Sequence, residues 1–141
     1  MAPTTHEIIC HNDWSPWNAL FRDGRFALIL DWDLAGPGSR LWDVANGATS
    51  WAPLFAEHTR HDIAHTARLV RLFLDAYGLE DRSQVLLTMR LRFQYVASFI
   101  AEQATLGDPG MRKLVSWDVP RKMGDDVRYL DEHQTALERA L

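Results

Sequence analysis

Three oxygen-bearing side chains near the start of the chain, Asp13, Asn18 and Asp31, have types and an order that suit phosphoryl transfer. Such a transfer needs a carboxylate beside the attacking hydroxyl group and oxygen ligands for a magnesium ion. Asp13 is the candidate base, because a carboxylate can orient the hydroxyl and take its proton. The amide oxygen of Asn18 and the carboxylate of Asp31 are ligands of the type that Mg²⁺ or Mn²⁺ prefers.

Three neighbouring polar residues support this set. His11 begins the pattern H-x-D-x-x-x-x-N over residues 11–18, and we expect it to organise the loop through its ring nitrogens. Asp43 either stabilises the N-terminus of an expected helix or accepts N–H bonds from the loop, and both roles can hold together. Asp33 is either a further metal ligand or a turn residue. A single Asp or Asn in a loop is usually a turn or cap residue, but the ordered set favours a site.

A short strand, a loop and a hairpin are expected to position these side chains. Residues 7–10 form an apolar run compatible with a buried strand, and residues 11–18 are expected to form a loop. Residues 19–22 and 25–30 flank an Asp-Gly pair, the turn signal of a β-hairpin, which places Asp31 at the end of the second strand.

The rest of the chain has a helical period. Residues 36–38, Gly-Pro-Gly, are predicted to be loop, and they lack the lysine and Ser/Thr of a phosphate-binding loop. Apolar spacing and stop signals predict helices over residues 41–51 before Pro53, 63–77 before Gly78, 85–106 before Gly107, and a weaker helix over 127–141. The sequence therefore predicts an α+β fold, mostly α, in a single domain over residues 1–141.

Composition narrows the class of protein. A hydrophobic fraction of 47% over 141 residues fits one compact domain, and the formal net charge of −4 argues against a nucleic-acid partner. The single cysteine, Cys10, is expected to be a small buried residue in a protein of the reducing cytoplasm. No apolar run approaches the roughly 18 residues of a membrane span, so no membrane association is expected.

Other features have ordinary interpretations that we favour. His58, His61 and His65 include a helical i,i+4 pair that can hold zinc, but a solvated helix face is the simpler explanation. The acidic residues Asp125, Asp126, Asp131 and Glu132 are expected to form a solvated face, with attraction of a cationic acceptor as the alternative. Among the tryptophans, Trp42 is expected in the core, whereas the roles of Trp14 and Trp17 stay open.

The segment ICHNDWSPWNALFRDGRFALILDWDLAGPGSRLWDVA, about a quarter of the chain, resembles the aminoglycoside phosphotransferase family. That family is itself similar to choline and homoserine kinases and, more distantly, to protein kinases. The catalytic-loop pattern of the family matches His11, Asp13 and Asn18. Its metal-binding aspartate, equivalent to the first residue of D-F-G, falls on Asp31, and its downstream aromatic-Asp-aliphatic-Ala motif places Asp43 as a loop-organising residue.

The resemblance implies a protein-kinase-like C-terminal lobe. Residues 1–40 would carry the catalytic loop and metal-binding hairpin, and residues 41–141 the helical subdomain. The implied activity is ATP-dependent O-phosphorylation of a small-molecule hydroxyl acceptor, which would be cationic in some members. Asp13 would be the base, and Asn18, Asp31 and, as an option, Asp33 would bind Mg²⁺ or Mn²⁺.

The nucleotide-gripping lobe that the resemblance also implies does not fit in residues 1–10. We therefore expect a homo-oligomer, or a partner chain that supplies the missing lobe and with it ATP binding. The chain alone is expected to turn over ATP very weakly or not at all. The alternative function is a non-catalytic interaction or oligomerisation module derived from a kinase.

Overall fold

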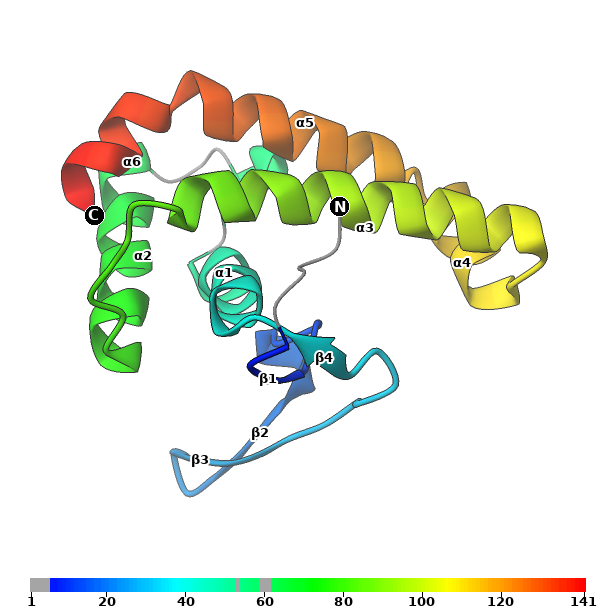
Figure 1. The fold of residues 1–141 in the computed structure, drawn as a ribbon, viewed down its shortest axis with the longest axis horizontal. Coiled ribbons are helices and arrows are strands. Elements are labelled where there is room, and N and C mark those ends of the chain that lie inside the picture. Colours follow the sequence, from blue (N-terminus) through cyan, green and yellow to red (C-terminus); the bar gives the residue numbers. More distant parts are fainter. Residues whose placement is uncertain (1–5, 53, 59–61) are drawn as a thin grey trace.

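A long helix, α3 (Val85–Leu106), runs through the middle of the helical body in this computed structural model. Helix α1 (Arg40–Trp51) packs on one side of it and α5 (Val119–Glu132) on the other (Figure 1). The strands lie beyond α1, away from α5. The fold is α+β and mostly helical, as the sequence predicts. The structure describes residues 6–52, 54–58 and 62–141.

Three further helices complete the body: α2 (Ile63–Tyr77), α4 (Pro109–Ser116) and α6 (Gln134–Ala140). The predicted ends of α2 and α3 are confirmed, because Gly78 and Gly107 follow them in left-handed conformations with φ of 78° and 107°. Glycine adopts this conformation without a steric penalty, which makes it the usual residue after a helix. The predicted helix over residues 41–51 corresponds to α1, while Pro53 lies outside the described residues.

The predicted hairpin is present as β2 (Ala19–Arg22) and β3 (Arg25–Ile29), paired antiparallel. Asp23 and Gly24 have φ values of 52° and 74°. Two successive residues with positive φ are typical of the tight turn whose twist matches that of a hairpin. The local Asp-Gly signal therefore specified this element.

A second strand pair corrects the prediction for residues 36–38. Strand β1 (Ile8–Cys10) pairs antiparallel with β4 (Gly36–Gly38), so this segment is a strand and not a loop. Pro37 lies opposite Ile9, and a proline is tolerated because a two-stranded pair has only edge strands. Strand β1 is also less buried than predicted, since the Ile9 side chain is exposed.

The core lies where α1, α2 and α3 meet α5 and α6. Trp42 and Cys10 are buried, as predicted. Each large aliphatic side chain buried there stabilises the fold by about 1.5–3 kcal/mol. The residues of this core include Val44, Ala45 and Ala48 of α1, Ala67, Val70 and Leu74 of α2, Val85, Met89 and Phe93 of α3, and Leu130 and Leu137 of α5 and α6.

The C-terminal third differs from the single weak helix predicted over residues 127–141. That segment holds the end of α5 and the whole of α6, which are separated at His133. Helix α4 was not predicted, although Asp108 and Pro109 are a recognisable start signal: the Asp108 carboxylate accepts a hydrogen bond from the N–H of Met111 at 2.9 Å.

The acidic run also departs from a simple solvated face. Asp126 is buried and accepts a hydrogen bond at 2.8 Å from the N–H of Ala56, in the short 3₁₀ helix Ala56–His58. Asp125 forms ion pairs with Arg121 and Arg128. Asp125 and Asp126 are thus both engaged by partners within the fold.

Gly47 of α1 lies against the rings of Trp14 and Phe73. A Cβ atom at Gly47 would lie 2.6 Å from Cζ of Phe73 and 2.8 Å from Cε3 of Trp14. We expect Gly47→Ala to destabilise the protein by about 1–3 kcal/mol, because both rings would have to move. Urea unfolding followed by tryptophan fluorescence measures this change.

The matched control is Gly124→Ala in α5, where a Cβ atom would meet no other heavy atom within 4 Å. This substitution is expected to be neutral or stabilising by up to about 1 kcal/mol, the difference in helix propensity between the two residues. Equal effects at the two positions would show that the contact at Gly47 does not constrain the packing.

Candidate active site

The loop over residues 11–18 is held to the helical body by Asp43. This residue lies in the first turn of α1, and its two carboxylate oxygens accept hydrogen bonds from the N–H groups of His11 at 3.0 Å and Asn12 at 2.9 Å. A carboxylate in this place also interacts favourably with the helix dipole. Both roles that the sequence left open for Asp43 are therefore present together in the geometry.

His11 joins the loop to the end of the hairpin. Its ring is buried, with 3% of the residue exposed, and packs edge-on against Trp32 with a centroid distance of 4.7 Å. Its Nδ1 atom accepts the N–H of Asp13 at 3.2 Å, so we place the proton on Nε2, which donates to the carbonyl of Leu30 at 2.8 Å. With both ring nitrogens engaged by the backbone, His11 is arranged to hold the loop.

Asp13 and Asn18 lie in direct contact. The amide nitrogen of Asn18, at the end of the 3₁₀ helix Pro16–Asn18, donates to Oδ2 of Asp13 at 2.8 Å and to its carbonyl oxygen at 2.9 Å. The Ser15 hydroxyl also donates to the Asp13 carbonyl at 3.2 Å. The spacing of five residues thus closes into a compact turn.

Burial is the main cause that raises the pKa of the Asp13 carboxyl above its ordinary value of 3.8. The hydrogen bond from Asn18 opposes this shift, and the negative charge of Asp31 adds to it. A raised pKa makes the carboxylate a better proton acceptor, because it brings the pKa nearer to neutral pH.

Asp31 lies just after strand β3 and close to the loop. The residue before it, Leu30, donates its N–H to the carbonyl of Asn18 at 2.7 Å and accepts from His11 through its own carbonyl. The side chain of Asp31 is exposed, as is that of Asp33. The structure thus brings the backbone of Asp31 beside the Asp13–Asn18 pair, while no contact of the Asp33 side chain links it to the loop among the interactions described.

Two residues at the site have a backbone conformation that is uncommon for residues other than glycine. Asn12 has a φ of 65° and Asp31 a φ of 60°. Such left-handed conformations carry a small energetic cost and gather at functional sites, where the surrounding contacts enforce them. Here Asn12 is fixed through its N–H by Asp43 and through its side-chain amide, which donates to the carbonyl of Leu34 at 2.9 Å.

The donor chemistry of Asn18 and Asp31 fits a magnesium ion. The side-chain nitrogen of Asn18 is engaged by Asp13 and its backbone carbonyl by Leu30, so the side-chain oxygen Oδ1 is the atom that remains for a cation. Asp31 adds an anionic oxygen. Mg²⁺ commonly binds one or two protein oxygens and completes its shell with phosphate and water.

Within the described ranges, no three His, Cys, Asp or Glu side chains gather into a metal-binding group. His65 lies on the exposed side of α2, whereas His61, its partner in the i,i+4 pair that could hold zinc, is outside the described residues.

Sequence reasoning missed two residues that hold the loop. The Asn46 side chain accepts the N–H of Trp14 at 2.7 Å, and the Trp14 ring packs against Phe73. Arg92 of α3 donates to the carbonyl of Asn12 at 2.9 Å. The sequence holds a signal for each of these contacts. Asn46 is three residues after Asp43 and so lies on the same face of the helix, and Arg92 is a charged residue on an otherwise apolar helix face. Of the tryptophans left open, Trp14 is half-buried in the loop support and Trp17 is exposed.

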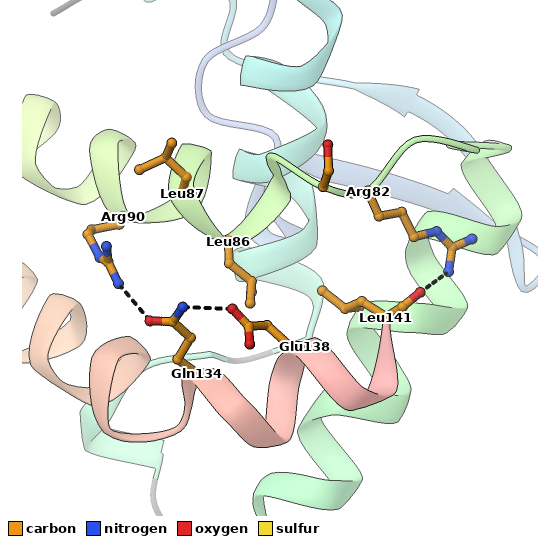
Figure 2. Close-up of a pocket in the computed structure, with 8 residues that line it drawn as sticks. Arg82, Leu86, Leu87, Arg90, Gln134, Glu138 and Leu141 are labelled. Carbon is orange, nitrogen blue, oxygen red and sulfur yellow. Dashed lines mark hydrogen bonds between the residues drawn. The ribbon is translucent and has the colours of Figure 1, made fainter.

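A cavity of about 450 Å³ lies elsewhere, between the start of α3 and helix α6 (Figure 2). Its lining includes Arg82, Arg90, Gln134, Glu138 and Leu141, and it shares no residue with the candidate site. Both arginines are engaged, since Arg82 pairs with Asp75, while Arg90 pairs with Asp131 and donates to Gln134. The chemistry of the candidate site is therefore independent of this cavity.

A sequence model of the phosphotransferase enzyme family matches residues 1–86, more than half of the chain. The chain belongs to this family. The family match covers the loop, the hairpin, Asp31 and Asp43, the residues on which the resemblance was based. The expected relationship to aminoglycoside phosphotransferases is therefore confirmed at the level of the family.

A curated protein is also similar to the chain. Over 82 residues the chain is 30% identical to the trifolitoxin immunity protein of Rhizobium leguminosarum bv. trifolii. The match covers 55% of this chain and 31% of that protein, so the chain spans about a third of its relative's length. No solved structure matches the chain. Among the described helices, none has the length and apolar character required to cross a bilayer.

Proposed function

We propose that this chain contributes the catalytic loop and metal site of an enzyme that transfers the γ-phosphoryl group of ATP to a hydroxyl group of a small molecule. The observation that carries the proposal is the 2.8 Å contact between Asp13 and Asn18, beside Asp31, inside the segment that matches the phosphotransferase enzyme family. The acceptor is proposed only as a class, a small-molecule hydroxyl compound, with cationic compounds among the options.

In the proposed reaction, Asp13 orients the acceptor hydroxyl and takes its proton as the oxygen attacks the γ-phosphorus. The bond from the γ-phosphorus to the bridging oxygen breaks, and ADP leaves with that oxygen. Asn18 holds the Asp13 carboxylate through its amide nitrogen, which keeps the base in one orientation. A magnesium ion held by Asn18 and Asp31 would supply positive charge to balance the phosphate oxygens.

Metal binding is the most direct test, because it requires no acceptor. Titration with Mn²⁺ should broaden the NMR signals of Asn18 and Asp31 before others, and Mg²⁺ should compete. Asp31→Ala should lower the affinity at least about tenfold, the order expected when one anionic ligand is removed. Asp33→Ala tests whether Asp33 is a further ligand, since an equal loss of metal affinity would add Asp33 to the metal-binding residues.

Asp23→Asn is the matched control, because Asp23 is an exposed aspartate in the turn of the same hairpin and asparagine removes its charge while tolerating its positive φ. It should leave the affinity unchanged. Broadening that spreads evenly over the acidic surface, or that survives in Asp31→Ala, would contradict the proposed metal site.

A second candidate function is an interaction module, and the exposed hairpin favours it. We name as the hairpin surface the residues Leu20, Phe21, Phe26, Leu28, Leu30 and Trp32, whose exposed fractions run from 43% to 55%. Leu20 and Phe21 of β2 and Phe26 and Leu28 of β3 are all about half exposed, so both strands of the hairpin present large apolar side chains to the surface. An apolar surface of this kind usually marks a contact with another polypeptide, and we propose a second copy of the chain as its occupant.

Sedimentation velocity over a range of concentrations tests this association. We expect a concentration-dependent dimer that is weakened by Leu28→Ser, because the substitution removes apolar area from the hairpin surface. The control Leu106→Ser removes a leucine that is 73% exposed at the end of α3 and should have no effect. Association that survives Asp13→Ala without detectable metal binding would favour this function over catalysis, whereas a strictly monomeric protein would exclude the self-associating form.

A further inference from the structure

Arg92 is a buried cation that reaches from the helical body into the candidate active site. Only 5% of the residue is exposed, and it lies on α3, eighty positions after the loop residue that it contacts. Its Nη2 atom donates to the carbonyl oxygen of Asn12 at 2.9 Å. Its Nη1 atom lies 3.4 Å from both the side-chain oxygen of Asn12 and the carbonyl of Trp42.

Burial of this charge is costly and needs compensation. Desolvation lowers the pKa of Arg92 to about 10, so the side chain stays protonated at neutral pH. The negative charges of Asp43 and Asp13 favour the cation, and the Trp42 ring lies 4.9 Å from Cζ of Arg92, within the range of a cation–π interaction. A buried arginine with this many polar contacts is a precise donor, because its guanidinium fork is rigid.

The contact fixes the peptide bond that precedes the candidate base. The carbonyl oxygen of this peptide belongs to Asn12 and is held by Arg92, while its N–H belongs to Asp13 and is held by Nδ1 of His11. The N–H of Asn12 itself is held by Asp43. Asn12 is therefore fixed on both sides in its left-handed conformation, with φ at 65°. The direction in which Asp13 leaves the loop depends on that conformation.

We propose that Arg92 is a positioning residue of the phosphotransfer site, which acts through Asn12 to set the orientation of Asp13. The catalytic part of this role rests on the proposed function, whereas the control of the loop conformation by Arg92 is independent of it. Arg92 lies beyond residues 1–86, the part that matches the family, so the proposal extends the site into α3.

The alternative is that Arg92 only fills the core. Local and global effects separate these roles. If Arg92 positions the loop, its substitution should lower the exchange protection of the N–H groups of His11, Asn12 and Asp13 selectively. If Arg92 only fills the core, its substitution should lower the protection of α1 and α3 to the same extent as that of the loop. Arg90 is the matched control, since it lies two positions earlier on α3 and pairs with Asp131. It also donates to Gln134 at the cavity (Figure 2).

Amide hydrogen exchange of the full chain, resolved by NMR, provides the test. Arg92→Met should lower the protection of the three loop amides roughly 10- to 100-fold, the factor that corresponds to one lost hydrogen bond of a charged donor. Arg92→Lys should retain part of the protection, because it keeps the charge but not the fork. Arg90→Met should leave the loop amides unchanged relative to those of α1.

The same variants carry a kinetic readout wherever ADP release from Mg·ATP is measurable. Arg92→Met should lower kcat roughly 10- to 100-fold with a change in KM below about threefold, because the loss concerns orientation and not binding. Uniform loss of protection in Arg92→Met and Arg92→Lys, or no loss in either, would overturn the proposal. If the loop loosens selectively while Asp31→Ala leaves metal binding intact, the proposed function fails but the control of the loop by Arg92 stands.

Discussion

Asp43→Ala is expected to lower the free energy of unfolding by about 2–6 kcal/mol, from two hydrogen bonds worth about 1–3 kcal/mol each. The N–H groups of His11 and Asn12 both lose their acceptor. Arg92 also loses the carboxylate that contributes most to stabilising its buried charge. Urea unfolding followed by tryptophan fluorescence measures the effect, with six tryptophans as probes.

Two variants make this result specific. Asp43→Asn keeps one side-chain oxygen as an acceptor and should lose roughly half as much stability. Asp62→Ala removes a carboxylate from a comparable place, the N-terminus of α2, where it accepts the N–H of Ala64 at 3.2 Å on an exposed surface. This control should cost about 0.5–2 kcal/mol. A loss in Asp43→Ala no larger than that of Asp62→Ala would mean that the loop is not anchored through Asp43.

Elements with local signals could be predicted from the sequence. The Asp-Gly pair specifies the hairpin because both residues accept positive φ, and Gly78 and Gly107 end their helices for the same reason. The spacing of Asp13 and Asn18 likewise forms a short turn whose contacts lie within the motif. In each case the interaction that fixes the structure joins residues a few positions apart, which sequence patterns register well.

Elements that depend on distant partners could not be predicted. Strand β4 exists because residues 36–38 pair with β1, which lies about 28 positions earlier, and Gly-Pro-Gly has no strand propensity of its own. Asp126 is buried because it accepts the N–H of Ala56 across seventy positions. The contact from Arg92 to Asn12 spans eighty positions and is of the same kind. Polar residues on helices look like solvated positions until the fold supplies a partner.

The proposed catalytic residues are therefore close together in the sequence, whereas the residues that support them are distant. Asp13, Asn18 and Asp31 fall within nineteen positions of the chain. Their support comes from α1 through Asp43 and from α3 through Arg92. The helical body is thus more than a neutral scaffold, because it contacts both sides of the loop residue that precedes the candidate base.

Asp13→Asn is expected to lower the rate of phosphoryl transfer by about 10²–10⁴, the usual contribution of a general base. Asparagine has nearly the same shape and can still accept the amide hydrogen bond of Asn18, so the loop geometry should be retained. ADP release from Mg·ATP, with an aminoglycoside and an amino alcohol as trial acceptors, measures the rate in the assembly that supplies ATP binding, because the chain alone is expected to turn over ATP very weakly. Asp23→Asn, an exposed substitution in the turn of the same hairpin and outside the proposed site, is the control and should leave the rate unchanged.

The same substitution should make the protein more stable at neutral pH, and this part of the prediction requires no acceptor. Burial raises the pKa of Asp13, so the folded state binds its proton more tightly than the unfolded chain does. The stability contributed by this group is therefore fully present below the unfolded pKa and is lost as the pH rises through the folded pKa. In metal-free buffer, Asp13→Asn should exceed the original protein in unfolding free energy at pH 7, and the difference should shrink below about pH 4. A base whose charged form destabilises the folded state is typical of a residue retained for activity. If Asp13→Asn instead lowers the unfolding free energy at pH 7 and the loss persists at pH 3, Asp13 is a structural residue of the loop.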